Sequence, residues 1–515
     1  MNKLFRRLLK LSLGTLCPIL NAAVAPAQTI EASIDSMVSS FMSDRKVPGF
    51  AACIVKDEAI VWSKAYGDAN IENKLPMSAE GIMNIGSVSK TFTTAAAMQL
   101  WEKGLLDLDE DVSKYLDFKV RNPKYPDKII TVFQILTHTS SIRDGQAYSH
   151  SYSCGDPTMA LQDWIFENLT PEGTFFHGGD NFGEWAPGSG KRRYSNVSFG
   201  LLGLIVEKIT KLPFNEYCKE FIFEPLDMNH TGWMLKEIDT KKHIIPYAYV
   251  TEQNRESLLG ESQLYPTGAD FKLGTFIPAC LYSFPNYPDG LVRTSVRELS
   301  NYLIAMMNGG NFKGKRILKK KTVEKMLCLQ IPGNSSQGLA WHIYEWDSPT
   351  ISNATIWGHT GGDPGITTYL FFDPVSRLGM ITFQNASTGG TSELFEALFK
   401  TVASRDIGSV SLELRPTKPG VFYADNIHWS AENKELLLTG KINVQFGDNN
   451  FKGNGSFSGL GKVNLLIVNG QKATAGSSVT TSGKKCFIQA LTKQDAVRKY
   501  GTDGEFGAIE ITIPH

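Results

Sequence analysis

The chain has 515 residues, of which 42% are hydrophobic and 20% are charged. This balance fits several globular domains and excludes a collagen-like, mucin-like or largely disordered protein. The 52 Lys and Arg residues equal the 52 Asp and Glu residues, but four basic residues and no acidic residue lie in the first 27, which leaves 48 basic against 52 acidic residues. A weakly acidic chain lacks the basic surface of a nucleic-acid-binding protein, so that class of function is excluded.

The first 27 residues have the pattern of a signal peptide. Basic residues within 3–10 precede an apolar stretch at 11–20, and residues 25–27 form an A-x-A cleavage pattern. The apolar stretch is too short to cross a hydrocarbon core of about 30 Å, and a lipid anchor on Cys17 is the alternative. We expect cleavage after residue 27, an exported protein that is periplasmic or secreted, and no transmembrane span in the mature chain.

Hydrophobic periodicity predicts the next elements in chain order. These are a helix at 30–41, a β-hairpin at 50–55 and 59–66, a helix from 87 to 104, a buried helix at 199–209, strands between 355 and 386, and an amphipathic helix at 391–404. Strands at both ends with helices between them predict one α/β layered domain, residues 28–410, whose sheet takes strands from both ends.

A change of composition at residues 415–420, R-P-T-K-P-G, is typical of a linker. Beyond it, strand patterns at 435–438, 441–446 and 464–468 are interrupted by a Gly-, Ser- and Asn-rich stretch at 448–461. We predict a second, small α+β domain at residues 411–515.

Cysteines are few and scattered. The six that remain after the predicted cleavage form no C-x-x-C pair, which is typical of neither a disulfide framework nor a zinc site. Most are expected to be buried as small hydrophobic residues. Cys154 and Cys280 lie in loop-like stretches and could pair after export, which the sequence leaves open. Neither a metal nor an organic cofactor is predicted.

A serine hydrolase needs a nucleophile, a group that takes its proton, and donors for the oxyanion. A Ser-x-x-Lys pattern at a helix start brings a lysine to a serine hydroxyl, because positions i and i+3 share a face. The pattern occurs at Ser43-Lys46, Ser87-Lys90 and Ser482-Lys485. Only Ser87 follows a glycine and opens a long helical run, where backbone amides favour an anionic oxygen. On this pattern alone, Ser87 is equally well explained as a nucleophile or as a helix cap.

A second element is Tyr194-Ser195-Asn196, the one Y-x-N among seventeen tyrosines. A tyrosine that faces a lysine can lose its proton below its free pKa of about 10, because the cation stabilises the phenolate, and can then act as a general base. The alternative is a surface turn in which Asn196 has a left-handed backbone.

A third element is His359-Thr360-Gly361, at a predicted strand edge ahead of Gly362. A similar triplet, His230-Thr231-Gly232, lies outside any strand pattern and is interpreted as a turn. Taken alone, His359 is more typical of a structural histidine.

The order of these elements resembles the serine β-lactamase and penicillin-binding protein superfamily, on its class C-like branch with esterases, D-amino-acid peptidases and carboxypeptidases. The resemblance runs from about residue 30 to 404 and includes matching stretches at 47–49, 85–92, 104–109, 136–140, 187–188 and 223–226. It implies a mixed α+β, β-lactamase/transpeptidase-like fold with an antiparallel central sheet and a helical subdomain.

The resemblance implies three catalytic residues. Ser87 would be the acylated nucleophile, and Lys90 would shuttle its proton. Tyr194 would be the base for acylation and for the activation of water. His138, in L-T-H-T-S, would brace a loop without a catalytic role.

Other matching residues would bind the substrate. Asn196 would orient it, and His359, Thr360 and Gly361 would line the strand along which the acyl chain lies. The backbone amides of Ser87 and Gly362 would form the oxyanion hole.

Two positions depart from the family pattern. Ser141 stands where the family has a glycine, which would alter a turn. His359 stands where drug-hydrolysing members carry a lysine, whose cation would face the carboxylate of β-lactams and of D-alanyl-D-alanine termini. Because histidine is largely neutral at pH 7, we predict that simple esters or D-residue amides are turned over better than cephalosporins. Carboxylate-bearing substrates would improve as the pH falls towards 6.

The end of the chain, from about residue 459, resembles the plug module of outer-membrane receptors on residues 464–470, 495–501 and 507–512. This resemblance implies a docking or stabilising module and a protein partner for the C-terminal domain.

Together, these features predict an exported serine hydrolase of esterase, D-aminopeptidase or carboxypeptidase type. It would act through an acyl-enzyme on a small-molecule or short-peptide acyl substrate. A β-lactamase proper and an acyltransferase use the same acyl-enzyme and stay open as alternatives. The alternative from another class is a penicillin-binding sensor or scaffold without turnover.

Overall fold

The computed structural model describes residues 25–331, 333–345 and 355–403, and beyond them the strands β16–β24 and Tyr500. The predicted signal peptide up to residue 24 and the predicted linker up to residue 419 lie outside the described residues, and Gly420 begins strand β16. Helix α1 (Ala25–Arg45) contains the helix predicted at 30–41. Among the described residues, none of the helices has the length and hydropathy of a membrane span.

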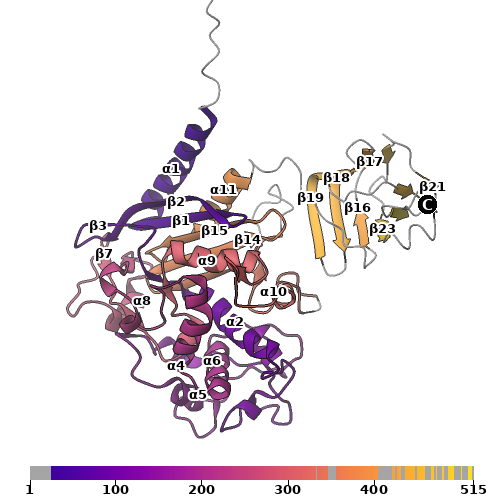
Figure 1. The fold of residues 1–515 in the computed structure, drawn as a ribbon. Coiled ribbons are helices and arrows are strands. Elements are labelled where there is room, and N and C mark those ends of the chain that lie inside the picture. Colours follow the sequence, from indigo (N-terminus) through magenta and orange to yellow (C-terminus); the bar gives the residue numbers. More distant parts are fainter. Residues whose placement is uncertain are drawn as a thin grey trace, which may run out of the picture.

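A seven-stranded antiparallel sheet forms the centre of the larger domain (Figure 1). Its strands are β1 (Gly49–Lys56), β2 (Ala59–Asn70), β3 (Leu75–Pro76), β12 (His342–Ile343), β13 (Trp357–Asp363), β14 (Ile366–Asp373) and β15 (Leu378–Gln384). They lie in the order β12-β13-β14-β15-β1-β2-β3, so β1 from the start of the domain pairs with β15 from its end. The prediction that both ends of the domain contribute strands to one sheet is confirmed.

Strand β1 shows why both faces of the sheet are covered. Successive side chains of a strand point to opposite faces. Phe50, Ala52 and Ile54 join a hydrophobic cluster with α1 and α11 (Thr391–Ala403). Residues 51, 53 and 55 join a larger cluster on the opposite face. Each face of the sheet is thus buried under helices.

The larger cluster extends into a helical part of the domain (Figure 1). Helix α2 (Ser89–Glu102) contacts α6 (Val197–Thr210), and α9 (Val296–Met307) contacts β1, β14 and β15. Both helices predicted in this region are therefore confirmed, as is the mixed α+β fold with an antiparallel central sheet and a helical subdomain. The other helices are α3 (Val132–Leu136), α4 (Gly145–Ser149), α5 (Leu161–Leu169), α7 (Phe214–Cys218), α8 (Arg255–Gly260) and α10 (Lys320–Met326).

Short two-stranded ribbons complete this domain. They are β4 (Met83–Asn84) with β9 (Arg293–Thr294), β5 (Ser153–Cys154) with β8 (Tyr282–Ser283), β6 (Tyr247–Tyr249) with β7 (Phe276–Pro278), and β10 (Asn311–Phe312) with β11 (Lys315–Arg316). Cys154 forms a disulfide bond with Cys280, the pairing that the sequence left open. Cys53 and Cys218 are buried thiols, but Cys280 and Cys328 are half-buried and Cys154 is exposed. The expectation that most cysteines are buried is therefore wrong for the described residues.

The described part of residues 411–515 is a second sheet. Its strands are β16 (Gly420–Tyr423), β17 (Asn426–Ser430), β18 (Glu435–Phe446), β19 (Asn449–Ser458), β20 (Leu466–Val468), β21 (Gln471–Lys472), β22 (Ser478–Thr480), β23 (Lys485–Leu491) and β24 (Ala508–Thr512). The predicted strands at 435–438 and 441–446 are joined in β18. The Gly-, Ser- and Asn-rich stretch is itself strand β19, because pairing with β18 overrides its low strand propensity. Tyr500 is the one described helical residue there.

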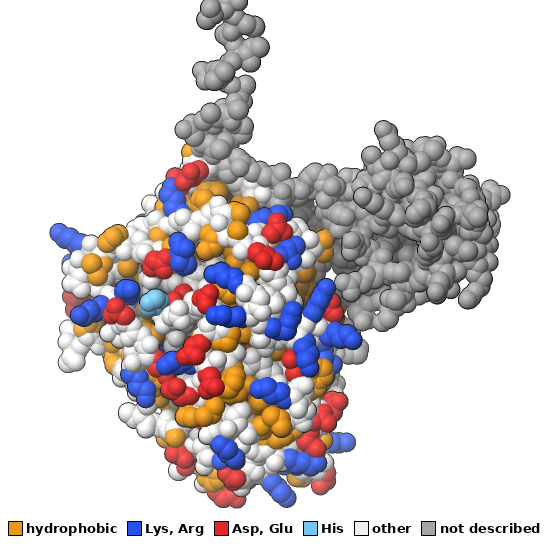
Figure 2. Space-filling model, viewed as in Figure 1, with side chains coloured by type: hydrophobic (Ala, Val, Ile, Leu, Met, Phe, Trp, Pro, Cys, Tyr) orange, Lys and Arg blue, Asp and Glu red, His pale blue; other side chains and the backbone are white. Residues whose placement is uncertain are grey.

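Charged side chains of both signs are interspersed over the face of the larger domain that Figure 2 shows. Lys, Arg, Asp and Glu alternate there with hydrophobic side chains, so this face carries no large area of a single sign.

We expect a chain that ends at Ser411 to stay folded and to keep its activity. Every strand of the seven-stranded sheet, and the helices on both of its faces, lie before residue 404. The truncation therefore removes no part of this core. Thermal unfolding and substrate turnover of the full-length and shortened chains would check this expectation. An insoluble or inactive shortened chain would show that the boundary at residue 410 is wrong.

Candidate active site

Ser87 lies in a 3-10 turn (Gly86–Val88) that leads directly into α2. Gly86 has a φ of +51°, a left-handed backbone that favours glycine. A Cβ atom at Gly86 would lie only 2.7 Å from the amide nitrogen of Gly362, and one at Gly361 would overlap the backbone before the turn. Glycine at both positions therefore lets strand β13 approach the turn and brings the Gly362 amide to Ser87.

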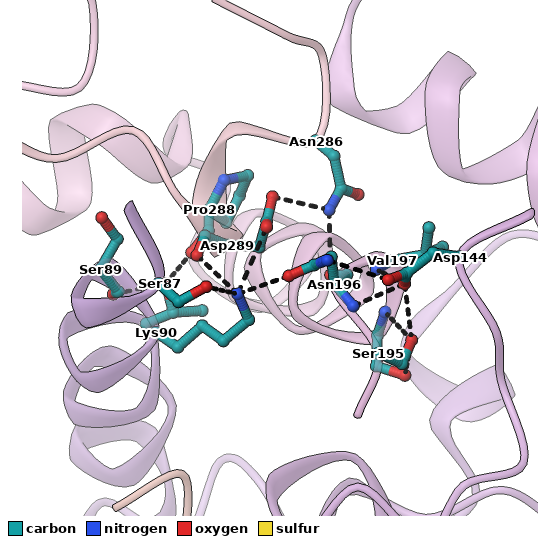
Figure 3. Close-up of polar contacts among 12 residues, drawn as sticks. Ser87, Ser89, Lys90, Asp144, Ser195, Asn196, Val197, Asn286, Pro288 and Asp289 are labelled. Carbon is teal, nitrogen blue, oxygen red and sulfur yellow. Dashed lines mark hydrogen bonds and ion pairs between the residues drawn. The ribbon is translucent and has the colours of Figure 1, made fainter. Parts of the chain in front are cut away.

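The Ser87 hydroxyl does not cap helix α2. The N-cap residue of this helix is Val88, and no side chain caps it. Instead, Lys90 Nζ donates a hydrogen bond to Ser87 Oγ over 3.0 Å (Figure 3). The hydroxyl thus has the lysine contact expected of a nucleophile and lacks the backbone contact expected of a cap.

Lys90 is fully buried, and its ammonium group has a partner for each proton (Figure 3). Besides Ser87, Nζ donates to Asn196 Oδ1 over 2.7 Å and to the carbonyl oxygen of Asp289 over 2.9 Å, and it lies 3.3 Å from Asp289 Oδ2. Burial alone would lower the pKa of Lys90, but its interactions with Tyr194 and Asp289 outweigh burial and raise it. Lys90 is therefore an ammonium at neutral pH, without a lone pair for the Ser87 proton.

Asn196 lies at the start of helix α6, where Asp144 holds it in place (Figure 3). The Asp144 carboxylate accepts hydrogen bonds from the Asn196 backbone and side-chain nitrogens, over 2.6 and 2.9 Å, and from the Val197 amide over 3.0 Å. A carboxylate at this position satisfies free amides of the first helical turn. Because Asn196 Nδ2 is bound to Asp144, its Oδ1 is available to Lys90.

Asp289 is a member of this network that no sequence pattern singles out. Its carboxylate accepts hydrogen bonds from the Tyr148 hydroxyl over 2.8 Å and from the Asn286 side chain over 2.9 Å. Figure 3 shows the contact with Asn286. Burial raises the pKa of Asp289 to about 6, against the opposing effects of Lys90, Tyr148 and Asn286. It is separated from Lys90 by 199 positions, so only the tertiary fold brings the pair together.

Tyr194 lies beside Lys90, whose Nζ is 5.0 Å from the centre of the tyrosine ring. Its buried hydroxyl makes no hydrogen bond of good geometry with a described residue. Burial raises the pKa of Tyr194, and the proximity of Lys90 and Ser87 only partly offsets this effect. Lys90 lowers the pKa of Tyr194, as expected, but burial raises it by more. The net shift of the pKa is therefore opposite to the prediction, and Tyr194 is protonated at neutral pH.

His138 supports Tyr194 from behind. The two rings lie 4.4 Å apart, and His138 Nδ1 accepts a hydrogen bond from the Ser195 amide over 3.2 Å. Burial lowers the pKa of His138 well below its usual value, so the ring is neutral. These contacts fit the bracing role that the sequence predicts. Ser141 has a φ of +65°, the left-handed backbone for which the family uses glycine.

A cavity of about 590 Å³ joins the predicted site residues. The residues that line it include Ser87, Arg192, Tyr194, His342, Glu345, His359 and Gly362. Thr360 also lines this cavity. Gly361 is the member of β13 that packs against the Ser87 turn. The structure thus brings every predicted site residue to one place.

His359 is a buried, neutral histidine with 3% of its surface exposed. Its Nδ1 lies 2.5 Å from the carbonyl oxygen of Thr360, so Nδ1 carries the proton and donates it. Burial, with added repulsion from His342 and Lys90, lowers the pKa of His359 well below its usual value. Burial lowers the pKa of His342 to about 4.

These directions revise the expected pH dependence. Neither histidine gains a proton between pH 8 and pH 6, so neither can favour a carboxylate there. We expect the ratio of kcat/KM for a carboxylate-bearing ester to kcat/KM for its uncharged analogue to follow the same pH profile in wild type and in His359→Gln. A rise towards pH 6 that disappears in the variant would contradict the assignment of a neutral His359.

Arg192 is a cationic residue of the cavity lining that was not predicted from the sequence. It stands two positions before Tyr194, and this placement is the signal that could have revealed it. Its side chain is exposed and lines the cavity together with Ser87 and His359. The cavity therefore holds a permanent cation although strand β13 carries no lysine at position 359.

The other candidate motifs lie outside this cavity or outside the described residues. Lys46 Nζ donates to the backbone oxygen of Ser43 on an exposed helix end. His230 Nδ1 lies 2.7 Å from Glu298 Oε1, in a turn as predicted. The side chains of the third Ser-x-x-Lys pattern are not among the described ones. Within the described residues, no group of three His, Cys, Asp or Glu side chains is placed to hold a metal ion.

An antiparallel sheet between helices, with a Ser-x-x-Lys turn facing one of its strands, defines the serine β-lactamase and penicillin-binding class of proteins. The Beta-lactamase family matches residues 34–403, well over half of the chain, and the chain belongs to this family.

Similar curated proteins are distant. Protein flp of Staphylococcus aureus (strain MRSA252) is 22% identical over 71% of this chain and 65% of its own length. Beta-lactamase-like protein 2 of Dictyostelium discoideum is 27% identical over 53% of this chain and 45% of its own length. The chain thus spans less than two thirds of the length of these relatives.

Solved structures share the fold. The octameric penicillin-binding protein homologue from Pyrococcus abyssi is 22% identical, with a TM-score of 0.56 over 89% of this chain and 96% of that chain. The D-amino acid amidase from Ochrobactrum anthropi SV3 is 20% identical, with a TM-score of 0.56 over 73% and 99%. The class C beta lactamase from Rhodobacter sphaeroides is 18% identical, with a TM-score of 0.53 over 72% and 99%. These comparisons lend no support to a plug module, which stays a prediction.

Proposed function

We propose that this protein is an exported serine hydrolase that cleaves ester bonds, or amide bonds of D-residue peptides, through an acyl-enzyme on Ser87. The observation that carries the proposal is the hydrogen bond from the buried Lys90 Nζ to Oγ of Ser87, which lines the cavity. Membership of the Beta-lactamase family supports a hydrolase of this superfamily. The D-amino acid amidase with the same fold supports the cleavage of amide bonds.

In the proposed reaction, Ser87 Oγ attacks the acyl carbon while the amides of Ser87 and Gly362 bind the developing oxyanion. Tyr194 first releases its hydroxyl proton to solvent. The resulting phenolate takes the serine proton and passes it to the leaving group. Water then attacks the ester on Ser87, with Tyr194 again as base, and the serine is regenerated. Burial keeps Tyr194 protonated in the resting protein, and the ammonium of Lys90 is the charge that stabilises the phenolate when it forms.

A turnover panel tests this proposal. It contains short p-nitrophenyl esters, D-alanyl and other D-residue peptides, and a chromogenic cephalosporin. We expect esters or D-residue amides to turn over, with release of the acid. Mass spectrometry of the intact protein over time separates the alternatives: a hydrolase loses the acyl group, a sensor retains it, and an acyltransferase delivers it to an added alcohol. Retention of every acyl group would contradict the proposal.

Export and the C-terminal region belong to the same proposal. The leader at residues 1–27 supports export, and the N-terminal sequence of the mature protein from cells would begin at Gln28. Residues 411–515 are proposed to dock a protein partner, since the serine site is built entirely from residues before 404.

A further inference from the structure

One hydrogen bond orients the Arg192 side chain in the cavity, and the two terminal nitrogens of its guanidinium group are left for a ligand. Its Nε donates a hydrogen bond to Gln337 Oε1 over 2.6 Å. Gln337 is itself buried and held by two further bonds, from its Nε2 to the carbonyl oxygen of Gly338 and from its amide to Asn334 Oδ1, both 2.8 Å long. Neither terminal nitrogen of Arg192 forms a hydrogen bond or ion pair with a described residue. Gln337 thus orients Arg192 through Nε and leaves the terminal N–H groups of the guanidinium available to a ligand.

Arg192 is also the one permanent cation among the described residues that line this cavity. The lining histidines, His342 and His359, are neutral, as shown above. Among the described residues that line the cavity, Glu345 is the one carboxylate. It is exposed and forms no ion pair with Arg192. The positive charge of Arg192 is therefore available to a ligand that reaches Ser87.

We propose that Arg192 is the specificity residue of this site and binds a carboxylate of the substrate. This inference rests on the proposed function and names its substrate class: acyl compounds that carry a carboxylate, such as the C-terminus of a D-residue peptide or the acid group of a β-lactam. A guanidinium binds a carboxylate through two parallel hydrogen bonds, and such charge-assisted bonds are stronger than neutral ones. Arg192 then supplies, from the loop before Tyr194, the charge that His359 does not supply from strand β13.

The test compares matched substrates that differ only in the carboxylate. One pair consists of aryl esters with and without a meta-carboxylate on the leaving phenol. A second pair is a D-alanyl peptide acid and its C-terminal amide, and a third is a cephalosporin acid and its methyl ester. For each pair, the preference is the ratio of kcat/KM for the acid to kcat/KM for its uncharged analogue. Comparison of the three pairs shows whether the carboxylate comes from a peptide, a β-lactam or a simple leaving group.

We expect Arg192→Gln to lower the preference about tenfold or more in at least one pair, the size expected for one lost charge-assisted hydrogen bond. Arg192→Lys should lower the preference less, because lysine keeps the positive charge but lacks the two parallel N–H donors of the guanidinium. Arg193→Gln is the matched control: it removes the same charge from the neighbouring exposed residue, which does not line the cavity, and should keep the wild-type preference. Glu345→Gln should raise the preference for the acid, since it removes a carboxylate that would repel the carboxylate of the substrate.

Two results would overturn the inference, and they are distinguishable. If the wild type turns over both members of the pairs and Arg192→Gln keeps every preference, Arg192 does not bind the carboxylate, and the proposed function stands. If the wild type forms no acyl-enzyme with any substrate, the proposed function fails, and this inference fails with it.

Discussion

Replacement of Ser87 by alanine should abolish covalent labelling and turnover while the protein stays folded. The substitution removes the only atom that can be acylated in the proposal, so we expect a loss of at least about a thousandfold in kcat/KM. Stability should change little, because Ser87 does not cap helix α2 and is only half-buried. Lys90 loses one hydrogen-bond acceptor but keeps Asn196 and Asp289.

The measurement is the mass of the intact protein after incubation with an active ester or a β-lactam, together with the thermal unfolding curve. Ser43→Ala is the matched control, since it alters the other described Ser-x-x-Lys pattern, on an exposed helix end. The control should be labelled and active like the wild type. Labelling of Ser87→Ala near the wild-type level would show that the nucleophile is another residue.

The parts of this site that the sequence predicts are those that depend on local geometry or on an ordered set of motifs. The contact between Ser87 and Lys90 follows from the i, i+3 relation at a helix start. Long stretches of chain separate Ser87 from Tyr194 and Asn196, and these from residues 359–361. The resemblance to a known family is what predicted that these three segments meet. The seven-stranded sheet was predictable because strand patterns occur at both ends of the domain.

The parts that escaped prediction depend on tertiary contacts and on burial. Asp289 and Asp144 occur in no recognisable pattern, and only the place of Arg192 two positions before Tyr194 marks it in the sequence. The role of each is defined by a contact with a distant segment. The direction of the Tyr194 pKa could not be foreseen either, because it is decided by desolvation, which a sequence does not show. The same reason applies to His359, for which the sequence suggested a pH-sensitive charge and the structure shows a neutral buried ring.

Replacement of Asp289 by asparagine should make the protein more stable above pH 6 and less active. The folded pKa of Asp289, about 6, is higher than the value of 3.8 for an ordinary aspartate. Between these values the folded state binds more protons than the unfolded state, so stability falls as the pH rises through this interval and stays lower above it. At about 1.4 kcal/mol per pKa unit, the ionised carboxylate costs on the order of 3 kcal/mol at pH 8, and the neutral asparagine avoids this cost.

The loss of activity has a separate cause. Asp289 is a positioning residue that acts through Lys90: it holds the ammonium by its carbonyl oxygen and its carboxylate, and its charge helps to keep the pKa of Lys90 high. Asparagine keeps the shape but loses the charge, so Lys90 would hold its proton less firmly and stabilise the Tyr194 phenolate less well. We expect kcat/KM at pH 8 to fall about tenfold to a hundredfold, with a changed pH profile, because active-site charges are commonly maintained at a cost in stability.

Urea unfolding at pH 8 and pH 4 measures the stability effect. The gain of Asp289→Asn should be largest at pH 8 and should be much smaller at pH 4, where the wild-type carboxyl is protonated in the folded state and partly protonated in the unfolded state. Asp363→Asn is the matched control: burial raises the pKa of Asp363 to about 7, its carboxylate accepts a hydrogen bond from Tyr152 over 2.7 Å, and it makes no contact with Lys90 in the described structure. Asp363→Asn should also be more stable than the wild type at pH 8. Because Asp363 does not contact Lys90, this control separates the removal of a buried charge from the loss of the contact with Lys90. An Asp289→Asn variant less stable than wild type at pH 8 would show that the ion pair with Lys90 outweighs the desolvation of Asp289, and that this carboxylate serves the fold as well as the site.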